Sequence, residues 1–410
     1  MKRKHLYWVL ADQVLVSGCN FAITILYARF FGPASFGTYA LITVAQQYFV
    51  SVSVSLVGNP LITTAPHVQD DIERARLIQG SFAAQLIVGA ALAFLAAAGM
   101  SICLLMGVAG VSAQTVAALA ASTFGLSTLE WMRRLCFLNR DGSSLLRFDA
   151  ITYLPIVVAA VVLSGHDLLT LDTAVLLWGI SSIAACLYAA RRLCLPSRPA
   201  GARRFLSQHW RASRDFVASF QAQWLGSQGI VYLAAPVVGA TGIGAYRSVA
   251  GLLGFTNALG TTLDNMLPLR FADAYRKGSD LALRKQTLRF GVALTGLLLL
   301  LLLPAGIFCR QIVGFLLGDA YVPYANILWV HGIGVSIVFA SRFAIYHERA
   351  RMKTHRIAIS AAVGAAVSTL LVIIASKALG PAGIAWSVAL GGAASLLYLC
   401  AGIVRPARKA

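Results

Sequence analysis

The chain has 410 residues, of which 58% are hydrophobic and only 12% charged, with a mean hydropathy of +0.75. Soluble domains carry about 25% charged residues, so this composition excludes an ordinary soluble fold. The net charge of +19 does not indicate a nucleic-acid-binding protein, because the Lys and Arg residues are dispersed over short connections and form no basic domain with interleaved aromatic residues.

Apolar stretches long enough to cross a bilayer, which takes about 20 helical residues, follow one another along the chain. Residues 288–308 and 357–376, for example, have no polar face and could not be helices of a soluble core. With Gly, Pro and charged residues as boundaries, the sequence predicts an all-α polytopic membrane protein of about twelve transmembrane helices. The predicted spans are residues 7–29, 36–62, 78–106, 111–135, 146–165, 172–191, 215–236, 243–268, 289–309, 323–346, 356–376 and 382–404.

The charges of the connections predict the orientation of the chain. Lys and Arg gather at the two termini and in the even-numbered connections, with Arg29, Arg247, Arg310 and Lys377 as the exceptions. Because connections rich in Lys and Arg stay on the cytoplasmic side, we expect both termini to be cytoplasmic. The seven Cys residues have no C-x-x-C pair and no regular spacing, which predicts neither a disulfide framework nor a zinc site.

An internal repeat divides the chain into two halves. Residues 28–39, ARFFGPASFGTY, and residues 235–246, APVVGATGIGAY, share Ala, two Gly and Tyr at matching places. A second match pairs Arg134 with Arg342, each at the cytoplasmic end of the fourth span of its half. The repeat predicts a six-helix lobe over residues 1–191, a basic cytoplasmic linker over 192–214 and a second six-helix lobe over 215–410. Two parallel lobes of this kind enclose a central cleft and can rock to expose it to either side, which is typical of transporters.

Charged residues inside the spans are the first candidates for function, because they are costly in a membrane. Arg29 ends the first span and Arg247 lies in the matching repeat segment, so both could face the cleft and bind a diphosphate with forked hydrogen bonds. Alternatively, each side chain reaches the outer head groups. Asp12 and Asp264 are candidates for coupling transport to an ion, unless they are solvated or paired with a basic loop. His331 could titrate near neutral pH, or could be a packed residue.

Uncharged polar and aromatic side chains cluster on the second and seventh spans. Gln46, Gln47, Gln223 and Trp224 could form a wall that faces a glycan, or they could join helices by hydrogen bonds. The sequence contains no G-x-x-x-x-G-K phosphate loop, no H-E-x-x-H and no G-x-S-x-G. We therefore expect no metal, no cofactor, no catalytic residues and no enzymatic activity.

Residues 27–39, YARFFGPASFGTY, resemble the segment A-R-x-x-G-P-x-x-F-G-x-Y that follows the first helix of polysaccharide and O-antigen flippases. The Arg133-Arg134 region and residues 379–385, LGPAGIA, are also similar to that family. These flippases belong to the multidrug/oligosaccharidyl-lipid/polysaccharide (MOP) exporter superfamily. Many members have fourteen spans, and this chain lacks room for the extra pair.

The resemblance implies a V-shaped pair of six-helix lobes with a cationic cavity, in a bacterial inner membrane. It implies alternating access driven by an ion gradient, with an undecaprenyl-diphosphate-linked oligosaccharide as cargo. The partners would be membrane lipids, a polysaccharide polymerase and glycosyltransferases, and no nucleic acid. Two alternatives remain open, a cation-coupled multidrug antiporter of the same superfamily and a membrane-embedded polysaccharide polymerase or ligase. The antiporter would favour acidic residues deep in the cleft, and the enzyme a sizeable outward loop.

Overall fold

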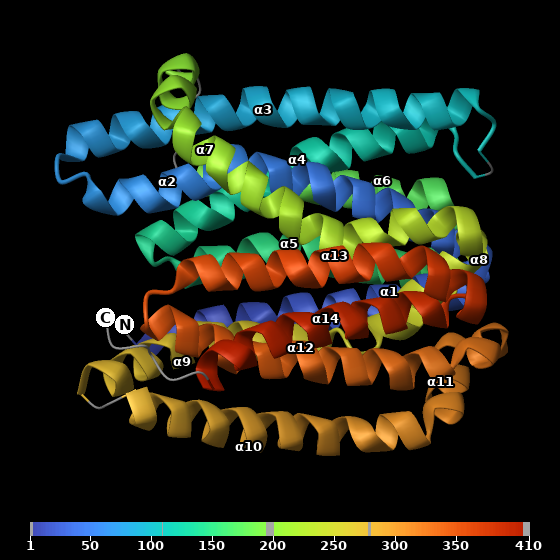
Figure 1. The fold of residues 1–410 in the computed structure, drawn as a ribbon. Coiled ribbons are helices and arrows are strands. Elements are labelled where there is room, and N and C mark those ends of the chain that lie inside the picture. The colour runs from blue at the N-terminus through green and yellow to red at the C-terminus, as the bar shows by residue number, and fades with distance from the viewer. Residues whose placement is uncertain (1–2, 109, 194–200, 278–279, 405–410) are drawn as a thin grey trace. The chain divides into compact units, whose positions relative to one another are not determined.

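The computed structural model describes residues 3–108, 110–193, 201–277 and 280–404, and every regular element in these ranges is a helix (Figure 1). In the first half the elements are α1 (Arg3–Ser53), the π-helical turn η1 (Val54–Gly58), α2 (Asn59–Thr64), the 3₁₀ turn η2 (Ala65–His67), α3 (Asp71–Leu105), α4 (Ala113–Asn139), α5 (Gly142–Gly165) and α6 (Leu171–Arg192). In the second half they are α7 (Ala202–Trp224), the π-helical turn η3 (Leu225–Gly229), α8 (Ile230–Gly251), α9 (Phe255–Lys277), α10 (Asp280–Ile307), α11 (Cys309–Leu317), the 3₁₀ turn η4 (Asp319–Tyr324), α12 (Asn326–Ala350), α13 (Thr354–Leu379) and α14 (Ala382–Val404).

Nine stretches of the described chain are long and apolar enough to cross a membrane. Two of them, Tyr7–His67 and Ala202–Gly251, are far longer than one crossing needs, and each contains a sharp change of direction. The all-α, multi-pass architecture predicted from the sequence is therefore confirmed.

The changes of direction occur at Gly32 in α1 and Gly239 in α8, which are equivalent positions of the internal repeat. Gly32 has φ 69° and ψ 174°, and Gly239 has φ 67° and ψ 178°, a conformation that is essentially restricted to glycine. The same unusual backbone thus recurs where the two repeats align, which supports the internal duplication. It also explains why each long stretch corresponds to two predicted spans.

The two repeat segments pack against each other in a reciprocal way. A Cβ atom at Gly37 would clash with the carbonyl oxygen of Ala240, and one at Gly244 would clash with that of Pro33. Pro33 and Ala240 occupy the same place in the two repeats, as do Gly37 and Gly244. The backbones approach closely here because both glycines lack a side chain.

The chain divides into two compact units, of which unit 1 comprises residues 1–31 and 38–221 and unit 2 comprises residues 32–37 and 222–410. In unit 1, α4 packs between α3 and α6, and α5 packs on α6. Its core contains Phe82 of α3, Trp131 of α4, Phe148 of α5 and Phe205 of α7. N-caps define where the helices begin, since Asp70, Ser112 and Thr170 accept hydrogen bonds from the first turns of α3, α4 and α6.

In unit 2, α14 packs on α13 and α12, α12 packs on α10, and α8 contacts α13. Small residues allow close contacts: a Cβ atom at Gly226 would lie 2.5 Å from Ala365 of α13. A Cβ atom at Gly383 in α14 would clash with the carbonyl oxygen of Ala375 in α13. Such contacts are typical of helices packed in membranes.

The structure differs from the sequence prediction in three places. Helix α7 begins at Ala202, within the stretch 192–214 predicted as a linker, and its first part belongs to unit 1. Residues 194–200 of that stretch lie outside the described residues. The predicted span 243–268 is interrupted between Gly251 and Phe255, and α11 and η4 occupy the predicted short connection after residue 309. Helix α11 buries Val313 and Leu317 while Phe315 is exposed, so it is an amphipathic helix too short to span.

Candidate functional site

A cluster of ionisable groups surrounds Arg133 in unit 1. Nη1 of Arg133 lies 2.5 Å from Oε1 of Glu130 in the same helix, α4. Nη2 lies 3.2 Å from Oδ2 of Asp149 in α5 and 3.8 Å from Oδ2 of Asp12 in α1. One guanidinium thus joins carboxyl groups from three helices of the unit.

The two carboxyl groups from α1 and α5 are inside the protein. Asp12 and Asp149 are fully buried, whereas Glu130 retains a third of its side-chain exposure. The carboxyl groups of Asp12 and Asp149 both lie within 4 Å of the same nitrogen, Nη2 of Arg133. Apart from these ion pairs with Arg133, their oxygens have no hydrogen-bond partner among the described residues. A single guanidinium does not balance this many carboxylates, so the arrangement suits the uptake of a proton or a cation.

The predicted glutamines of unit 1 have different surroundings. Gln46 is buried and its Nε2 donates a hydrogen bond to Oγ of Ser122, so it joins α1 to α4. Gln47, the next residue, is exposed. Tyr48 accepts a hydrogen bond of 2.6 Å from Nε2 of Gln221 at the unit 1 end of α7. Of the two predicted residues, Gln47 remains available to a ligand.

In unit 2, the predicted residues Arg247 and His331 are linked through Tyr246, the neighbour of Arg247 in the chain. Nη1 of Arg247 in α8 donates a 2.8 Å hydrogen bond to Oε1 of Gln228 in η3. Tyr246, which precedes Arg247, packs its ring perpendicular to that of His331 in α12, with 5.9 Å between the centroids. Nδ1 of His331 is buried and has no hydrogen-bond partner in the described chain. Arg247, Gln228 and His331 form what we call the Arg247 cluster.

The π-helical turn η3 shapes this cluster. Trp224 ends α7 immediately before η3, and its ring lies 6.1 Å from that of Tyr232 in α8. Gln223 is exposed and Trp224 is half-buried. A π-helical turn inserts an extra residue into the helix and is frequent at functional sites. Here it presents Gln228 to Arg247.

Asp264, in α9, is held by two residues of α12. Nη1 of Arg342 forms an ion pair with Oδ2 of Asp264, and the hydroxyl of Tyr346 donates a 2.5 Å hydrogen bond to Oδ1. Gly260, one turn before Asp264, leaves room for the Arg342 side chain, because a Cβ atom there would lie 2.6 Å from Cζ. Asp264 therefore has partners within its own unit and is not merely solvated.

The remaining predicted residue, Arg29, is exposed on α1, three residues before the kink at Gly32. It belongs to unit 1, whereas Arg247 belongs to unit 2.

Sequence reasoning missed Glu130, Arg133 and Asp149 as members of a site. The signal was present, because all three are charged residues within or beside predicted apolar spans. In the sequence Arg133 looks like part of the basic connection after the fourth span, so its pairing with buried carboxyl groups was not predicted. Its pairing with Asp12 depends on the packing of α1 against α4 and cannot be read from spacing along the chain.

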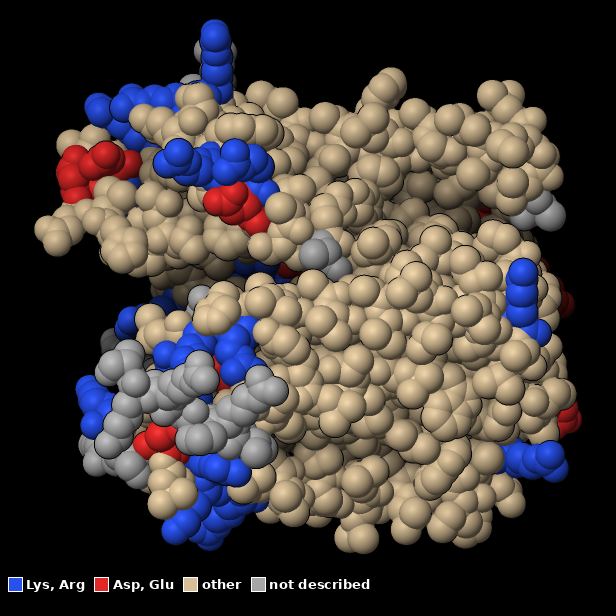
Figure 2. Space-filling view, viewed as in Figure 1, with Lys and Arg blue, Asp and Glu red and all other residues tan. Residues whose placement is uncertain are grey.

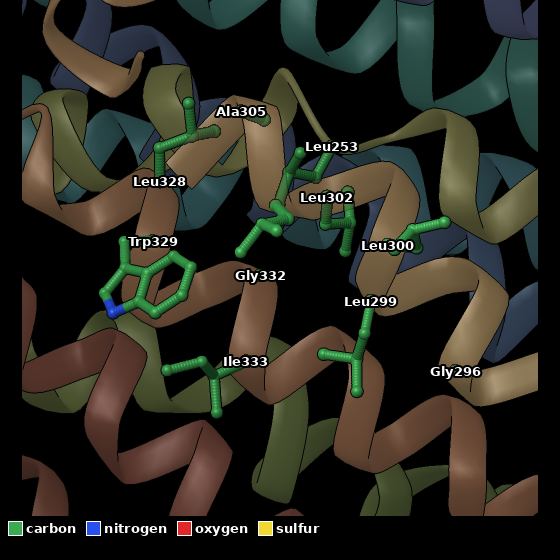
Figure 3. Close-up of a pocket in the computed structure, with 11 residues that line it drawn as sticks. Leu253, Gly296, Leu299, Leu300, Leu302, Ala305, Leu328, Trp329, Gly332 and Ile333 are labelled. Carbon is green, nitrogen blue, oxygen red and sulfur yellow. The ribbon is translucent and has the colours of Figure 1, made fainter. Parts of the chain in front are cut away.

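An apolar pocket of about 290 Å³ lies beside α10 and α12 of unit 2 (Figure 3). Its lining includes Leu253, Leu299, Leu302, Trp329 and Ile333. The Trp329 ring covers Gly306, where a Cβ atom would clash with it. With such a lining the pocket suits hydrocarbon and is not a site for a charged group.

No family model matches the sequence, and no curated protein is significantly similar to it. Solved structures with the same fold were found. A lipid II flippase MurJ in an inward closed conformation has a TM-score of 0.74 and 14% identity, with 98% of this chain and 88% of that chain covered. An inward-facing multidrug resistance MATE family transporter of the MOP superfamily has a TM-score of 0.66 and 14% identity, covering 97% and 93%. The Vibrio cholerae MATE transporter VcmN in the bent form has a TM-score of 0.60 and 14% identity, covering 98% and 95%.

These neighbours have a fold of twelve helices in two lobes, so the predicted fold class is confirmed. At this level of identity the similarity concerns the fold alone.

Proposed function

We propose that this protein is a flippase of the MOP superfamily. It moves undecaprenyl-diphosphate-linked oligosaccharide units from the cytoplasmic to the periplasmic leaflet of a bacterial inner membrane, with both termini cytoplasmic. The observation that carries this proposal is the similarity of fold to a lipid II flippase over 98% of the chain. Transport proceeds by alternating access, and the protein performs no enzymatic step.

Arg247 is the residue we propose to bind the diphosphate. One of its five N–H donors is used on Gln228, which fixes the direction of the guanidinium and leaves other donors for phosphate oxygens. Arg29, exposed on α1, provides a second guanidinium for the same cargo. Amide and aromatic surface is presented to the glycan by Gln47, Gln223 and Trp224. Gln46 instead holds α1 to α4 through its hydrogen bond to Ser122.

Asp12 and Asp149 are the groups we propose to couple transport to an ion gradient. They are buried, close together and share the charge of Arg133. Binding of one proton or monovalent cation between them removes one unit of the excess negative charge and changes how α1, α4 and α5 attract one another. Asp264 and His331 are weaker candidates, since Asp264 already has Arg342 and Tyr346 as partners.

The test is made in a strain that lacks this protein and does not display its surface polysaccharide. Complementation with wild type, Arg29→Ala, Arg247→Ala or the control Arg310→Ala is followed by measuring which membrane face holds the undecaprenyl-linked oligosaccharide. We expect the cargo to stay cytoplasmic in the deletion and in the Arg247→Ala strain, and to cross normally with Arg310→Ala. Each variant must reach the membrane at normal abundance. Intact units on the outer face without this protein would contradict the flippase function.

The buried acidic pair favours a second candidate function, a cation-coupled multidrug antiporter. Two of the structural neighbours named above are multidrug resistance or MATE transporters, and acidic residues attract cationic drugs. The two functions are separated by measuring dye efflux in the deletion strain complemented with wild type or with Asp12→Asn. Wild-type protein that extrudes a cationic dye, with loss of extrusion in Asp12→Asn and normal oligosaccharide display in the deletion, would favour the antiporter.

A further inference from the structure

Helix α7 carries a basic face that the proposed transport cycle does not use. Phe205 and Ser213 are buried against unit 1, where the Ser213 hydroxyl donates a 2.7 Å hydrogen bond to the carbonyl oxygen of Leu56 in η1. On the other side, exposed side chains follow one another along the helix. They are Arg203, Arg204, Trp210, Arg211 and Arg214.

These exposed residues share one face of the helix. At about 100° per residue, their directions fall within an arc of about 120°. The buried Phe205 and Ser213 lie outside that arc. We call the five exposed residues the α7 basic face. Three or more guanidiniums on so narrow a surface repel one another unless anions lie between them.

Few carboxylates of the protein balance the α7 basic face. Arg214 contacts the neighbouring Asp215 at 3.2 Å, and both side chains are exposed. Among the described residues, no carboxylate forms an ion pair with Arg203, Arg204 or Arg211. The face thus lacks internal counter-charges and fits an external anion.

An apolar groove of about 400 Å³ adjoins the same face. Ile87 of α3 forms one wall, and Ala202, Leu206 and Trp210 of α7 form the other, with Arg203 beside them. Ile87 and Trp210 are 59% and 58% exposed, although both are large and hydrophobic. This wall of the groove belongs to α3, a helix that is long and apolar enough to cross a membrane. Figure 2 shows a related contrast, with Lys and Arg gathered toward the two ends of the view and long surfaces without charged residues between them.

A groove for hydrocarbon beside unbalanced guanidiniums matches one kind of molecule. We propose that the α7 basic face binds an anionic phospholipid, with the phosphate on Arg203, Arg204 and Arg211 and an acyl chain in the groove. An exposed Trp210 beside the guanidiniums fits a lipid at the level of the head groups, the depth that tryptophan prefers in membranes. An acidic protein would match the charges but would leave the groove and its exposed Ile87 unexplained. The site does not depend on the cargo of the transporter.

The test compares two variants of the full-length protein that lose the same charge. One is Arg203→Gln/Arg204→Gln/Arg211→Gln, and the other is Arg76→Gln/Arg276→Gln/Arg289→Gln, whose three arginines are exposed on other helices. Each is purified from mixed phosphatidylglycerol and phosphatidylcholine, and the retained lipid is counted by native mass spectrometry. Each arginine near an anionic head group contributes about a fivefold gain, so we expect the α7 variant to bind phosphatidylglycerol about a hundredfold more weakly if all three contribute, and at least about tenfold more weakly if two do. The control variant should bind it as the wild type does.

A second measurement locates the lipid. Brominated phosphatidylglycerol should quench tryptophan fluorescence more than brominated phosphatidylcholine, and Trp210→Phe should remove that difference. Equal loss of phosphatidylglycerol in both triple variants would overturn the site, because it would reflect net charge alone. Unchanged phosphatidylglycerol binding in the α7 variant would also overturn the lipid site. It would indicate that the α7 basic face binds an acidic protein instead.

Discussion

At the scale of single residues, Arg133 stands out in unit 1 because several carboxyl groups surround its guanidinium. Its guanidinium contacts carboxyl groups from α1, α4 and α5, of which two are fully buried. Removing one partner of a buried ion pair usually costs more than the pair contributes, because the remaining charge stays in a poorly solvating environment. Arg133 therefore supports the structure of the unit as well as the proposed ion site.

Arg133→Gln should lower the free energy of unfolding by about 3–5 kcal/mol, because Asp12 and Asp149 lose their counter-charge. Thermal unfolding in detergent measures this loss. Arg147→Gln, an exposed arginine of α5, should change stability little and serves as the control. Adding Asp149→Asn to Arg133→Gln should recover part of the stability. If the double variant is less stable than Arg133→Gln alone, the charge imbalance is not the cause.

Asp141, between α4 and α5, provides a pH-dependent contribution. Burial acts to raise the pKa of Asp141, but hydrogen bonds from Ser144 and Ser143 outweigh it and hold the pKa below its usual value. Since the folded pKa is the lower one, the stabilisation is present above the unfolded pKa, near 3.9, and is lost as pH falls through the folded value. Asp141→Ala should cost about 1 kcal/mol at pH 7 through loss of the N-cap, and less near pH 3. Melting temperatures of wild type and Asp141→Ala at the two pH values test this. If the difference between the two proteins is the same at both pH values, the charge of Asp141 has no role.

At the scale of helices, the kinks at Gly32 and Gly239 determine how each long apolar stretch reverses. Their φ and ψ values are nearly the same, although their immediate neighbours in the chain differ. A side chain at either position is strained by the backbone alone, because a Cβ atom added to either glycine would have no other atom within 4 Å. The free-energy cost of a substitution at either glycine therefore comes from the backbone conformation and not from altered side-chain packing.

Gly32→Ala and Gly239→Ala should each destabilise the protein by about 1–3 kcal/mol, the usual cost of holding such a residue in this conformation. Gly18→Ala is the matched control, since Gly18 lies in the regular part of α1 and also has no atom within 4 Å of a Cβ position. It should stabilise the protein by about 0.5–1 kcal/mol. Thermal unfolding measures all three, and equal effects at Gly18 and Gly32 would exclude backbone strain.

At the scale of the whole molecule, the distribution of Lys and Arg predicts which side each connection faces. The chain offers exposed positions to test it within unit 1 and within unit 2. Leu105 at the end of α3 is 87% exposed, and Met352 between α12 and α13 is 84% exposed. The predicted topology puts them on opposite sides of the membrane.

In a variant without native cysteines, Met352→Cys should react with a membrane-impermeant maleimide in inverted vesicles, and Leu105→Cys in right-side-out vesicles. Mass shift on a gel reports the labelling. Reaction of both from one side would disprove the predicted orientation and require a different number of spans between them.

Much of the fold could be predicted from the sequence, because apolar length and basic connections are local signals. The repeat around Gly32 and Gly239 was also visible, since glycines mark positions that other residues avoid. The interruption after Gly251 and helix α11 were not predicted, because hydropathy does not register a short break or a short amphipathic helix. The Asp12, Arg133 and Asp149 cluster was missed for another reason. Its members are distant in sequence and meet through helix packing, and their charges alone do not specify partners.

The reciprocal contact of Gly37 with Ala240 and of Gly244 with Pro33 has a consequence for the history of this gene. After a duplication, two copies of a segment ordinarily diverge independently. Here a larger residue in one copy clashes with the main chain of the other, which no change of side chain there can relieve. Selection therefore acts on both copies together, and we expect homologous lineages to retain glycine at both positions long after the surrounding residues have drifted apart.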